Sequence, residues 1–265
     1  MLRSPYSGRM GNMIWFILFI FGLAIGSFVN VVATRYDGDH FLFSNSLIGG
    51  RSHCDNCKKT LRWFELLPLI SFVAQGARCR RCKAKLSFQY PLVEIISGAI
   101  FIFVPLAQGL TFLSVLWIVV FESLLIMTII DIRLGIIPDE LCILLGVLGS
   151  ILAVENAPES RIIGALAAGA FFGFLILITK GKGMGMGDLK LVIPLGLLFG
   201  WPTISMVFMV AFFVGAVVGL LSIAAHKNTM KGTIPFGPFL AIGSVFIFFW
   251  SQPMAAWYLS MLGLQ

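Results

Sequence analysis

The sequence predicts an all-α polytopic membrane protein that crosses the bilayer about eight times and carries a small polar loop domain. The first observation is composition: 58% of the 265 residues are hydrophobic and only 12% are charged, whereas soluble domains carry roughly 25% charged residues. The mean hydropathy of +0.97 agrees with this. The other two observations are the apolar runs along the chain and the unequal charge of the segments between them.

Eight apolar runs account for the predicted transmembrane helices. They lie at 13–33, 91–108, 112–130, 138–154, 162–179, 189–200, 203–225 and 237–262. Most approach the roughly 20 residues that a helix needs to cross the hydrocarbon core, and 189–200 is the shortest. The first run exceeds the roughly 7–15 apolar residues of a signal peptide, and no A-x-A cleavage pattern follows it. We therefore expect it to be a retained span.

The basic residues predict the orientation of these spans. Alternate connecting segments hold 16 of the 19 lysines and arginines, and the opposite segments hold only Arg3, Arg9 and Arg161. Basic residues collect on the cytoplasmic side of a membrane, so both termini are expected outside the cytoplasm. We divide the chain into an N-terminal helix (1–34), a cytoplasmic loop domain (35–90) and a seven-helix membrane core (91–265). The net charge of +7 then reflects topology.

The loop domain carries two CxxC pairs. Cys54 and Cys57 form the first, and Cys79 and Cys82 form the second after 21 intervening residues. Two such pairs can supply four thiolates to one tetrahedral zinc ion, although this spacing exceeds the usual window by one residue. Two disulfides are the alternative, but a cytoplasmic loop keeps its thiols reduced. We expect these four cysteines to bind a structural Zn²⁺.

The loop domain is also basic, with ten lysines and arginines against four acids, Asp37, Asp39, Asp55 and Glu65. A basic zinc ribbon can bind nucleic acid, but aromatic residues for base stacking are sparse here. Contact with anionic lipid headgroups of the bilayer is the interpretation that we favour. Nucleic acid is not an expected partner. The fifth cysteine, Cys142, falls inside an apolar run and is expected to pack as a small apolar residue.

Three aspartates lie at the cytoplasmic ends of predicted spans. Asp131 directly follows the third run, Asp139 follows Pro138 at the start of the fourth, and Asp188 directly precedes the sixth. Such acids are costly unless they have a partner or a function. Two carboxylates in one partly desolvated site do not both ionise easily, so one can act as general base and the other as general acid. Alternatively, Asp131 pairs with Arg133 or lies at the lipid interface. Asp139 and Glu140 are competing candidates for the pair, or acids of a first helical turn that the helix dipole favours.

The stretch 180–190, KGKGMGMGDLK, places glycines at alternate positions before Asp188. Glycine-rich backbone is conformationally free and lets another chain approach closely, so Gly183, Gly185 and Gly187 are candidates for aligning an extended substrate. A short turn with a capping aspartate is the alternative. No Ser-His pairing is evident, because the three histidines His40, His53 and His226 lie in loops outside the acid-bearing motifs.

In combination, these motifs resemble the type IV prepilin peptidases, membrane aspartic peptidases of the GxGD kind. The resemblance covers nearly the whole chain: GSFVNVVATR (26–35), the paired CxxC loop, YPLVE (90–94), DIRLGIIPDEL (131–141), GMGDLKL (185–191) and IPFGPFLAIG (234–243). It implies that Asp131 and Asp188 are the catalytic pair and that 91–265 is the peptidase core. Gly185, Gly187, Lys190 and Asp139 are the expected substrate-binding residues.

The resemblance also implies what such an enzyme does. The family removes the basic leader of prepilin or pseudopilin precursors at the cytoplasmic face of the inner membrane. Its bifunctional members, which carry the four-cysteine loop, then methylate the new N-terminal residue with S-adenosyl-L-methionine. Glu94 is similar to a family acid near that activity; the alternative is an interfacial Glu94 paired with a basic loop residue. The chain departs from the family at Asp55-Asn56, where C-P-x-C is usual, and at Leu66-Leu67, where the family often has Asp-Asn before the proline that corresponds to Pro68.

Two other function classes are alternatives to an enzyme. Ion-coupled transporters also place acids and glycine-broken helix ends in the membrane, but here the acids fall at cytoplasmic ends and no internal repeat is evident. A zinc-bearing membrane scaffold would leave both aspartates dispensable. The motif combination favours the peptidase over both.

Overall fold

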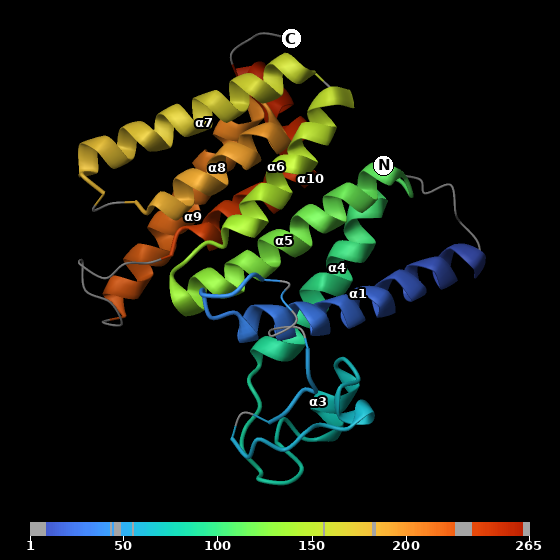
Figure 1. Cartoon of the computed structure of the whole chain (residues 1–265). Helices are drawn as coiled ribbons and strands as arrows, with labels where there is room; N and C mark the ends of the chain where they lie inside the picture. Colours follow the sequence, from blue (N-terminus) through green and yellow to red (C-terminus); the bar gives the residue numbers. More distant parts are fainter. Residues whose placement is uncertain are drawn as a thin grey trace. The chain divides into compact units, whose positions relative to one another are not determined.

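The computed structural model describes residues 9–42, 44, 49–54, 56–155, 157–181, 184–225 and 235–261. The described chain is helical apart from turns and two isolated bridges in the loop domain (Figure 1). Its elements are α1 (Arg9–Arg35), η1 (Trp63–Glu65), α3 (Ile70–Ala74), α4 (Gln89–Gln108), α5 (Phe112–Leu134), α6 (Asp139–Glu155), α7 (Pro158–Thr179), α8 (Met186–Phe199), α9 (Thr203–Ala224) and α10 (Gly237–Met261).

The all-α membrane prediction is confirmed. Helices occupy all eight predicted runs. Within the described residues, five helices are long and apolar enough to cross a membrane: α1, α4, α5, α7 and α9. α8 has only 14 residues, as the short sixth run predicted, and the described part of α10 counts as a shorter apolar helix.

The chain divides into two compact units, Met1–Ile126 and Met127–Gln265, and the boundary falls within α5. In the first unit α1 packs closely on α4. A Cβ added at Gly22 would lie 2.8 Å from Gly98 Cα, so small residues allow the two backbones to approach. The Ser97 hydroxyl lies 2.7 Å from Gly22 O and 2.8 Å from Glu122 Oε1, which adds a buried polar link between the helices.

The two CxxC segments of the loop domain fold alike. The Lys58 N–H donates to Cys54 O at 2.8 Å, and the Lys83 N–H donates to Cys79 O at 3.0 Å. Both lysines have positive φ, 54° and 57°. Each cysteine pair is therefore presented by the same tight turn, as expected for two equivalent halves of one metal site.

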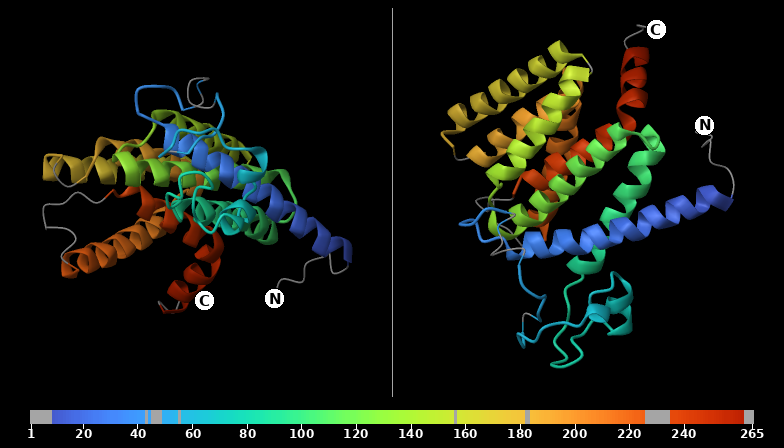
Figure 2. Two further views of the ribbon diagram at one scale, coloured as in Figure 1. Left: turned by 90° about the horizontal axis from the view of Figure 1, so that it is seen from below. Right: turned by 45° about the vertical axis from the view of Figure 1, so that its right-hand side comes forward.

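In the second unit α8 lies between α6 and α7, and α9 packs on α10 (Figure 2). Here too small residues set the spacing, since a Cβ at Gly164 would lie 2.7 Å from Gly196 O. The Arg161 guanidinium donates to Leu197 O at 2.9 Å and also to Leu198 O. It thereby satisfies carbonyls at the C-terminal end of α8, which otherwise have no partner within the helix. The N-terminal end of α8 carries Asp188.

Candidate functional site

Asp131 lies near the C-terminal end of α5 and is 5% exposed. The N–H of Gly237, the first residue of α10, donates to Asp131 Oδ2 at 3.0 Å. A Cβ at position 237 would lie 2.6 Å from the same oxygen. Only glycine therefore lets this amide reach the buried carboxylate, and the start of α10 holds one face of Asp131 in place.

Asp188 is the third residue of α8 and is 8% exposed. Its Oδ2 accepts a hydrogen bond from the Gly185 N–H at 3.2 Å. Gly185 has extended backbone angles and precedes the helix, so the acid satisfies an N–H at the helix start, as an N3 acid does in a capping box. The capping interpretation of Asp188 is thus correct in geometry, and it fixes the carboxylate at a buried helix end.

The structure brings Asp131 and Asp188 together within the second unit, although 56 residues separate them in the chain. They are close enough for the charge of Asp188 to act on Asp131. Each has one oxygen held by a glycine amide, and in the described residues Oδ1 of neither acid accepts a hydrogen bond. Two buried acids so arranged can hold a water between them and exchange protons with it.

The other predicted substrate-binding residues lie around this pair. Lys190 of α8 donates to both carboxylate oxygens of Asp139 at the start of α6, at 2.8 and 2.9 Å, and both side chains are exposed. A Cβ at Gly187 would lie 3.3 Å from Ile137 Cβ, so this glycine packs against the segment between α5 and α6. Gly185 is exposed. The predicted Gly183 and the histidine His226 lie outside the described residues.

The four predicted metal ligands converge in the first unit. The sulfurs of Cys54, Cys57, Cys79 and Cys82 all lie within 4.8 Å of one another, and Cys54 Sγ is 3.8 Å from Cys82 Sγ. A tetrahedral shell with Zn–S distances of about 2.3 Å places its sulfurs about 3.8 Å apart. All described cysteines are free thiols, so the cluster fits zinc and the disulfide alternative finds no support.

Local hydrogen bonds and burial shift the pKa values of two of these thiols in opposite directions. The backbone N–H of Ala84, followed by the side chain of Asn56, lowers the pKa of the Cys82 thiol to about 6. The N–H of Cys57 acts in the same direction on Cys54, but burial and the neighbouring thiols outweigh it and raise that pKa to about 11. One thiol is thus ionised near neutral pH while another keeps its proton, so zinc binding would release protons. Cys142 is buried in α6, as predicted.

Glu94 lies one and a half turns into α4 and is 7% exposed. It accepts a hydrogen bond from the Leu69 N–H at 2.8 Å and another from Ser27. Leu69 reaches it from a backbone with φ 56°, which is unusual for leucine. In the described residues Glu94 forms no salt bridge. The alternative in which a basic loop residue pairs with Glu94 is therefore not seen there.

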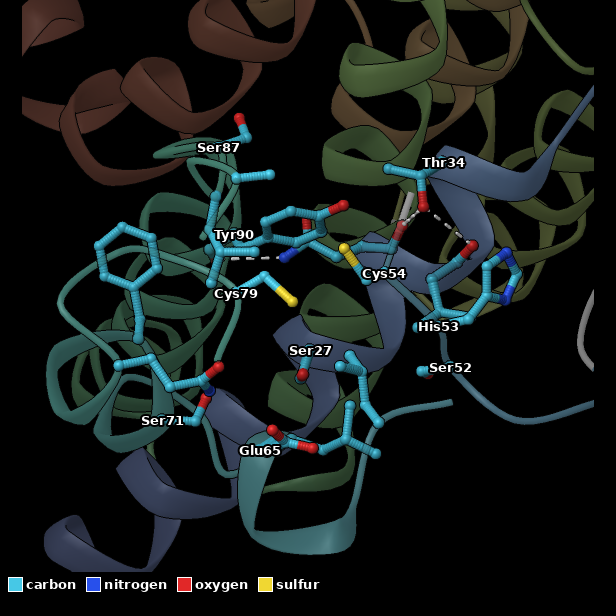
Figure 3. Close-up of a pocket in the computed structure, with 18 of the residues that line it drawn as sticks. Ser27, Thr34, Ser52, His53, Cys54, Glu65, Ser71, Cys79, Ser87 and Tyr90 are labelled. Atoms are coloured by element: carbon cyan, nitrogen blue, oxygen red, sulfur yellow. Dashed lines mark hydrogen bonds between the residues drawn. The ribbon is translucent and has the colours of Figure 1, made fainter. Parts of the chain in front are cut away.

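Glu94 lines a cavity of about 380 Å³ within the first unit. Figure 3 shows this cavity, with Ser27 of α1 and Glu65 of the loop below the sulfurs of Cys54 and Cys79. Sequence reasoning missed this cavity and two residues, Asn30, which lines it, and Gly237, which binds Asp131. The sequence features that could have indicated these two residues are the lone asparagine inside the first apolar run and the glycine in the last motif.

Comparison with known proteins identifies the family of the chain. Residues 20–108 match the bacterial peptidase A24 N-terminal domain, and residues 118–220 match the type IV leader peptidase family. A protein from Stutzerimonas stutzeri named prepilin leader peptidase/N-methyltransferase is 31% identical, covering 97% of this chain and 98% of its own. One of the same name from Bacillus subtilis (strain 168) is 31% identical, covering 92% and 98%.

A third relative of this name, from Aeromonas hydrophila, is 30% identical over 92% of this chain and 93% of its own. No solved structure matches the chain significantly. The transporter alternative finds no support in these comparisons. The chain belongs to the type IV leader peptidase family.

Proposed function

We propose that this member of the type IV leader peptidase family is a membrane aspartic endopeptidase that removes the leader of prepilin-like precursors and then methylates the new N-terminal residue. The main support for peptidase activity is the pair of buried carboxylates, Asp131 and Asp188, each of which accepts a hydrogen bond from a glycine amide. The family name and this pair support the same reaction class, hydrolysis of a peptide bond.

In the proposed mechanism a water binds between the free oxygens of the two acids. The ionised carboxylate takes a proton from the water as it attacks the scissile carbonyl carbon, and the protonated acid donates to the carbonyl oxygen. The C–N bond then breaks as the leaving amine takes the proton that the first acid removed from the water, and the second acid recovers its proton from the hydroxyl of the tetrahedral intermediate. No covalent intermediate is needed. The Gly185 and Gly237 amides act by fixing where each carboxylate lies, so that their geometry is set before substrate binds.

The substrate is proposed to lie along the glycine-rich start of α8. Gly185 and Gly187 leave the backbone there open to an extended chain, and non-helical backbone at a membrane site is tolerated where it borders water or protein. Asp139 is the acid that would meet basic leader residues. Because it is paired with Lys190, the leader has to compete with that lysine, which therefore tunes recognition.

The proposal also covers the orientation of the active site, the role of zinc and the methylation site. The charge bias supports an active site that faces the cytoplasm, and membership of the family supports the bacterial inner membrane as its location. Zinc in the four-cysteine cluster holds the loop domain without entering the reaction, because four thiolates leave no coordination position for water. S-adenosyl-L-methionine supplies the methyl group, and Glu94 belongs to the methylation site.

The test is cleavage and methylation by the purified full chain. Wild-type protein in detergent is incubated with a pilin-type precursor and S-adenosyl-L-methionine, and mass spectrometry reads the mature N-terminus. We expect a shortened product with one added methyl group. Asp131→Asn and Asp188→Asn are expected to abolish cleavage. Glu122→Gln, which changes another buried acid outside the site, is the matched control and should cleave normally.

Each half of the proposal can fail separately. An intact precursor after incubation with wild-type protein contradicts the peptidase. A cleaved but unmethylated product contradicts the methyltransferase alone. Cleavage by either aspartate variant at a near-normal rate contradicts the assignment of the catalytic pair.

A further inference from the structure

Residues 63–77 of the loop domain, WFELLPLISFVAQGA, contain no lysine or arginine, although ten of these basic residues lie elsewhere in the domain. The stretch includes η1 and α3, and its only charged residue is Glu65. Arg62 directly precedes it and Arg78 directly follows it. An apolar stretch with basic residues at both ends is typical of a segment that lies in a membrane interface.

α3 directs its apolar side chains away from the rest of the protein. Ile70 is 65% exposed and Val73 is 78% exposed, and their i, i+3 spacing puts them on one face of the helix. The polar Ser71 and Gln75 instead line the cavity of about 380 Å³, where Figure 3 shows Ser71. A helix on the surface of a domain in water buries its apolar face and exposes its polar face. The orientation of α3 is the reverse, which is expected where lipid lies outside it.

Leu69, directly before α3, contacts α4 well inside the end of that helix. Its N–H donates to Glu94 Oε2 at 2.8 Å, and Glu94 lies about 7.5 Å along α4 from Gln89, at 1.5 Å per residue. Glu94 in turn packs on α1, because a Cβ at Gly26 would lie 2.8 Å from Glu94 Cα. Gly26 lies about 13.5 Å along α1 from its end at Arg35. Both helices are long and apolar enough to cross a membrane, so Leu69 lies beside spanning turns and not beyond them.

An exposed apolar stripe on α4 continues the outward face of α3. Phe88, Leu92 and Ile95 are exposed, and at i, i+4 and i+7 they share one side of the helix. Phe88 directly precedes α4, and its ring contacts that of Phe72 in α3, with 5.4 Å between the ring centroids. Leu92 and Ile95 belong to a helix that is apolar enough to span the membrane, so their surroundings are lipid. The same lipid then borders α3.

The backbone around α3 meets the condition that lipid imposes. Away from water, each N–H needs a partner within the protein. The Leu69 N–H has one in Glu94. The Ser71 N–H donates to Leu67 O at 3.0 Å. The Val73 N–H donates to Leu69 O at 3.1 Å. These three donors are therefore satisfied without water.

We propose that the stretch 63–77 inserts into the bilayer leaflet next to the loop domain. The side chains that contact the acyl chains are exposed and apolar: Trp63, Ile70, Val73 and Phe88. Arg62 and Arg78 stay among the headgroups. This contact differs from that of a basic domain resting on anionic headgroups, because burial of apolar side chains needs no anionic lipid and persists at high salt. Neither peptidase nor methyltransferase activity is needed for it.

The test is photolabelling from the hydrocarbon core of the bilayer. Purified full-chain wild type is reconstituted at high salt in vesicles of phosphatidylcholine, an uncharged lipid, with a photoactivatable group on the acyl chains. After irradiation, peptide mapping by mass spectrometry should find lipid adducts within 63–77 as well as in the transmembrane helices. The basic segment 80–85 of the same domain should carry none. Absence of adducts from 63–77, or equal labelling of 80–85, overturns the proposal.

Variants identify the side chains that insert. Ile70→Glu combined with Val73→Glu puts two charges on the outward face of α3 and should abolish labelling of 63–77. Phe41→Glu changes another exposed apolar side chain of the loop domain; it is the matched control and should keep the label. Wild-type zinc content shows that the loop domain is folded, and if it is lost, the measurement on wild type still decides. Full labelling of the double variant overturns the proposal.

A second copy of the chain or a precursor could cover the same surface instead of lipid. A photoreactive amino acid in place of Val73 distinguishes these occupants, because it attaches to whatever lies against α3. We expect lipid adducts in vesicles, both with and without added precursor. Crosslinks to protein in place of lipid adducts overturn the proposal.

Discussion

Replacing Gly237 with alanine is expected to disable proteolysis while leaving the rest of the protein folded. The added Cβ would lie 2.6 Å from Asp131 Oδ2, whereas ordinary C···O contacts begin at about 3.3 Å. The carboxylate or the start of α10 then has to move by about 0.7 Å. The present N–H···O distance of 3.0 Å would lengthen to about 3.7 Å, which is no longer a hydrogen bond.

A hydrogen bond to a charged group is worth about 1.5–3 kcal/mol. If that energy holds Asp131 in its reactive position, kcat/KM should fall by about 10- to 150-fold. The assay is cleavage of a precursor peptide by the purified variant, with thermal unfolding and zinc content measured beside it. Gly173→Ala is the matched control, because a Cβ at that position in α7 meets nothing within 4 Å. Wild-type kcat/KM in Gly237→Ala would refute the positioning role.

Three further predictions concern other parts of the chain. Cys79→Ser should lower zinc content well below one ion per chain, because it removes one of the four clustered sulfurs; metal analysis showing full zinc would contradict it. Lys190→Ala releases Asp139 from an exposed ion pair worth about 0–1 kcal/mol. Stability should therefore change little, while KM for a basic leader should fall; an unchanged KM counts against Asp139 as the leader's partner. A reporter that is active only in the cytoplasm, fused after Gln265, should stay silent, because the charge bias predicts a C-terminus outside the cytoplasm; an active reporter would contradict the predicted topology.

What the sequence could predict follows from patterns that are local or periodic. Apolar runs predicted the helices, and the count of spans predicted, without any tertiary information, that Asp131 and Asp188 lie at the same membrane surface. The CxxC pairs predicted the sulfur cluster because each pair is fixed by a single turn. These features depend on neighbouring residues and on the count of spans.

Features that depend on how helices pack could not be predicted in the same way. The amide of Gly237 lies 106 residues from Asp131, and nothing local to either residue indicates their contact. Asp139 and Lys190 were separate substrate candidates, yet the packing of α6 on α8 pairs them. The sequence leaves open a pairing of Glu94 with a basic loop residue, but Leu69, with its positive φ, brings a backbone N–H to Glu94.

The central claim is that Asp131 and Asp188 act as one unit on one water. The most direct test compares kcat/KM for Asp131→Asn, Asp188→Asn and the double variant, using the purified chain and one precursor. Loss of a general acid or base costs about 10²–10⁴-fold, and residues that act as a unit lose no more together than singly. We predict that each single variant falls by about this factor and that the double variant is no slower. Near-normal cleavage by either single variant, or losses that multiply in the double variant, would contradict the account.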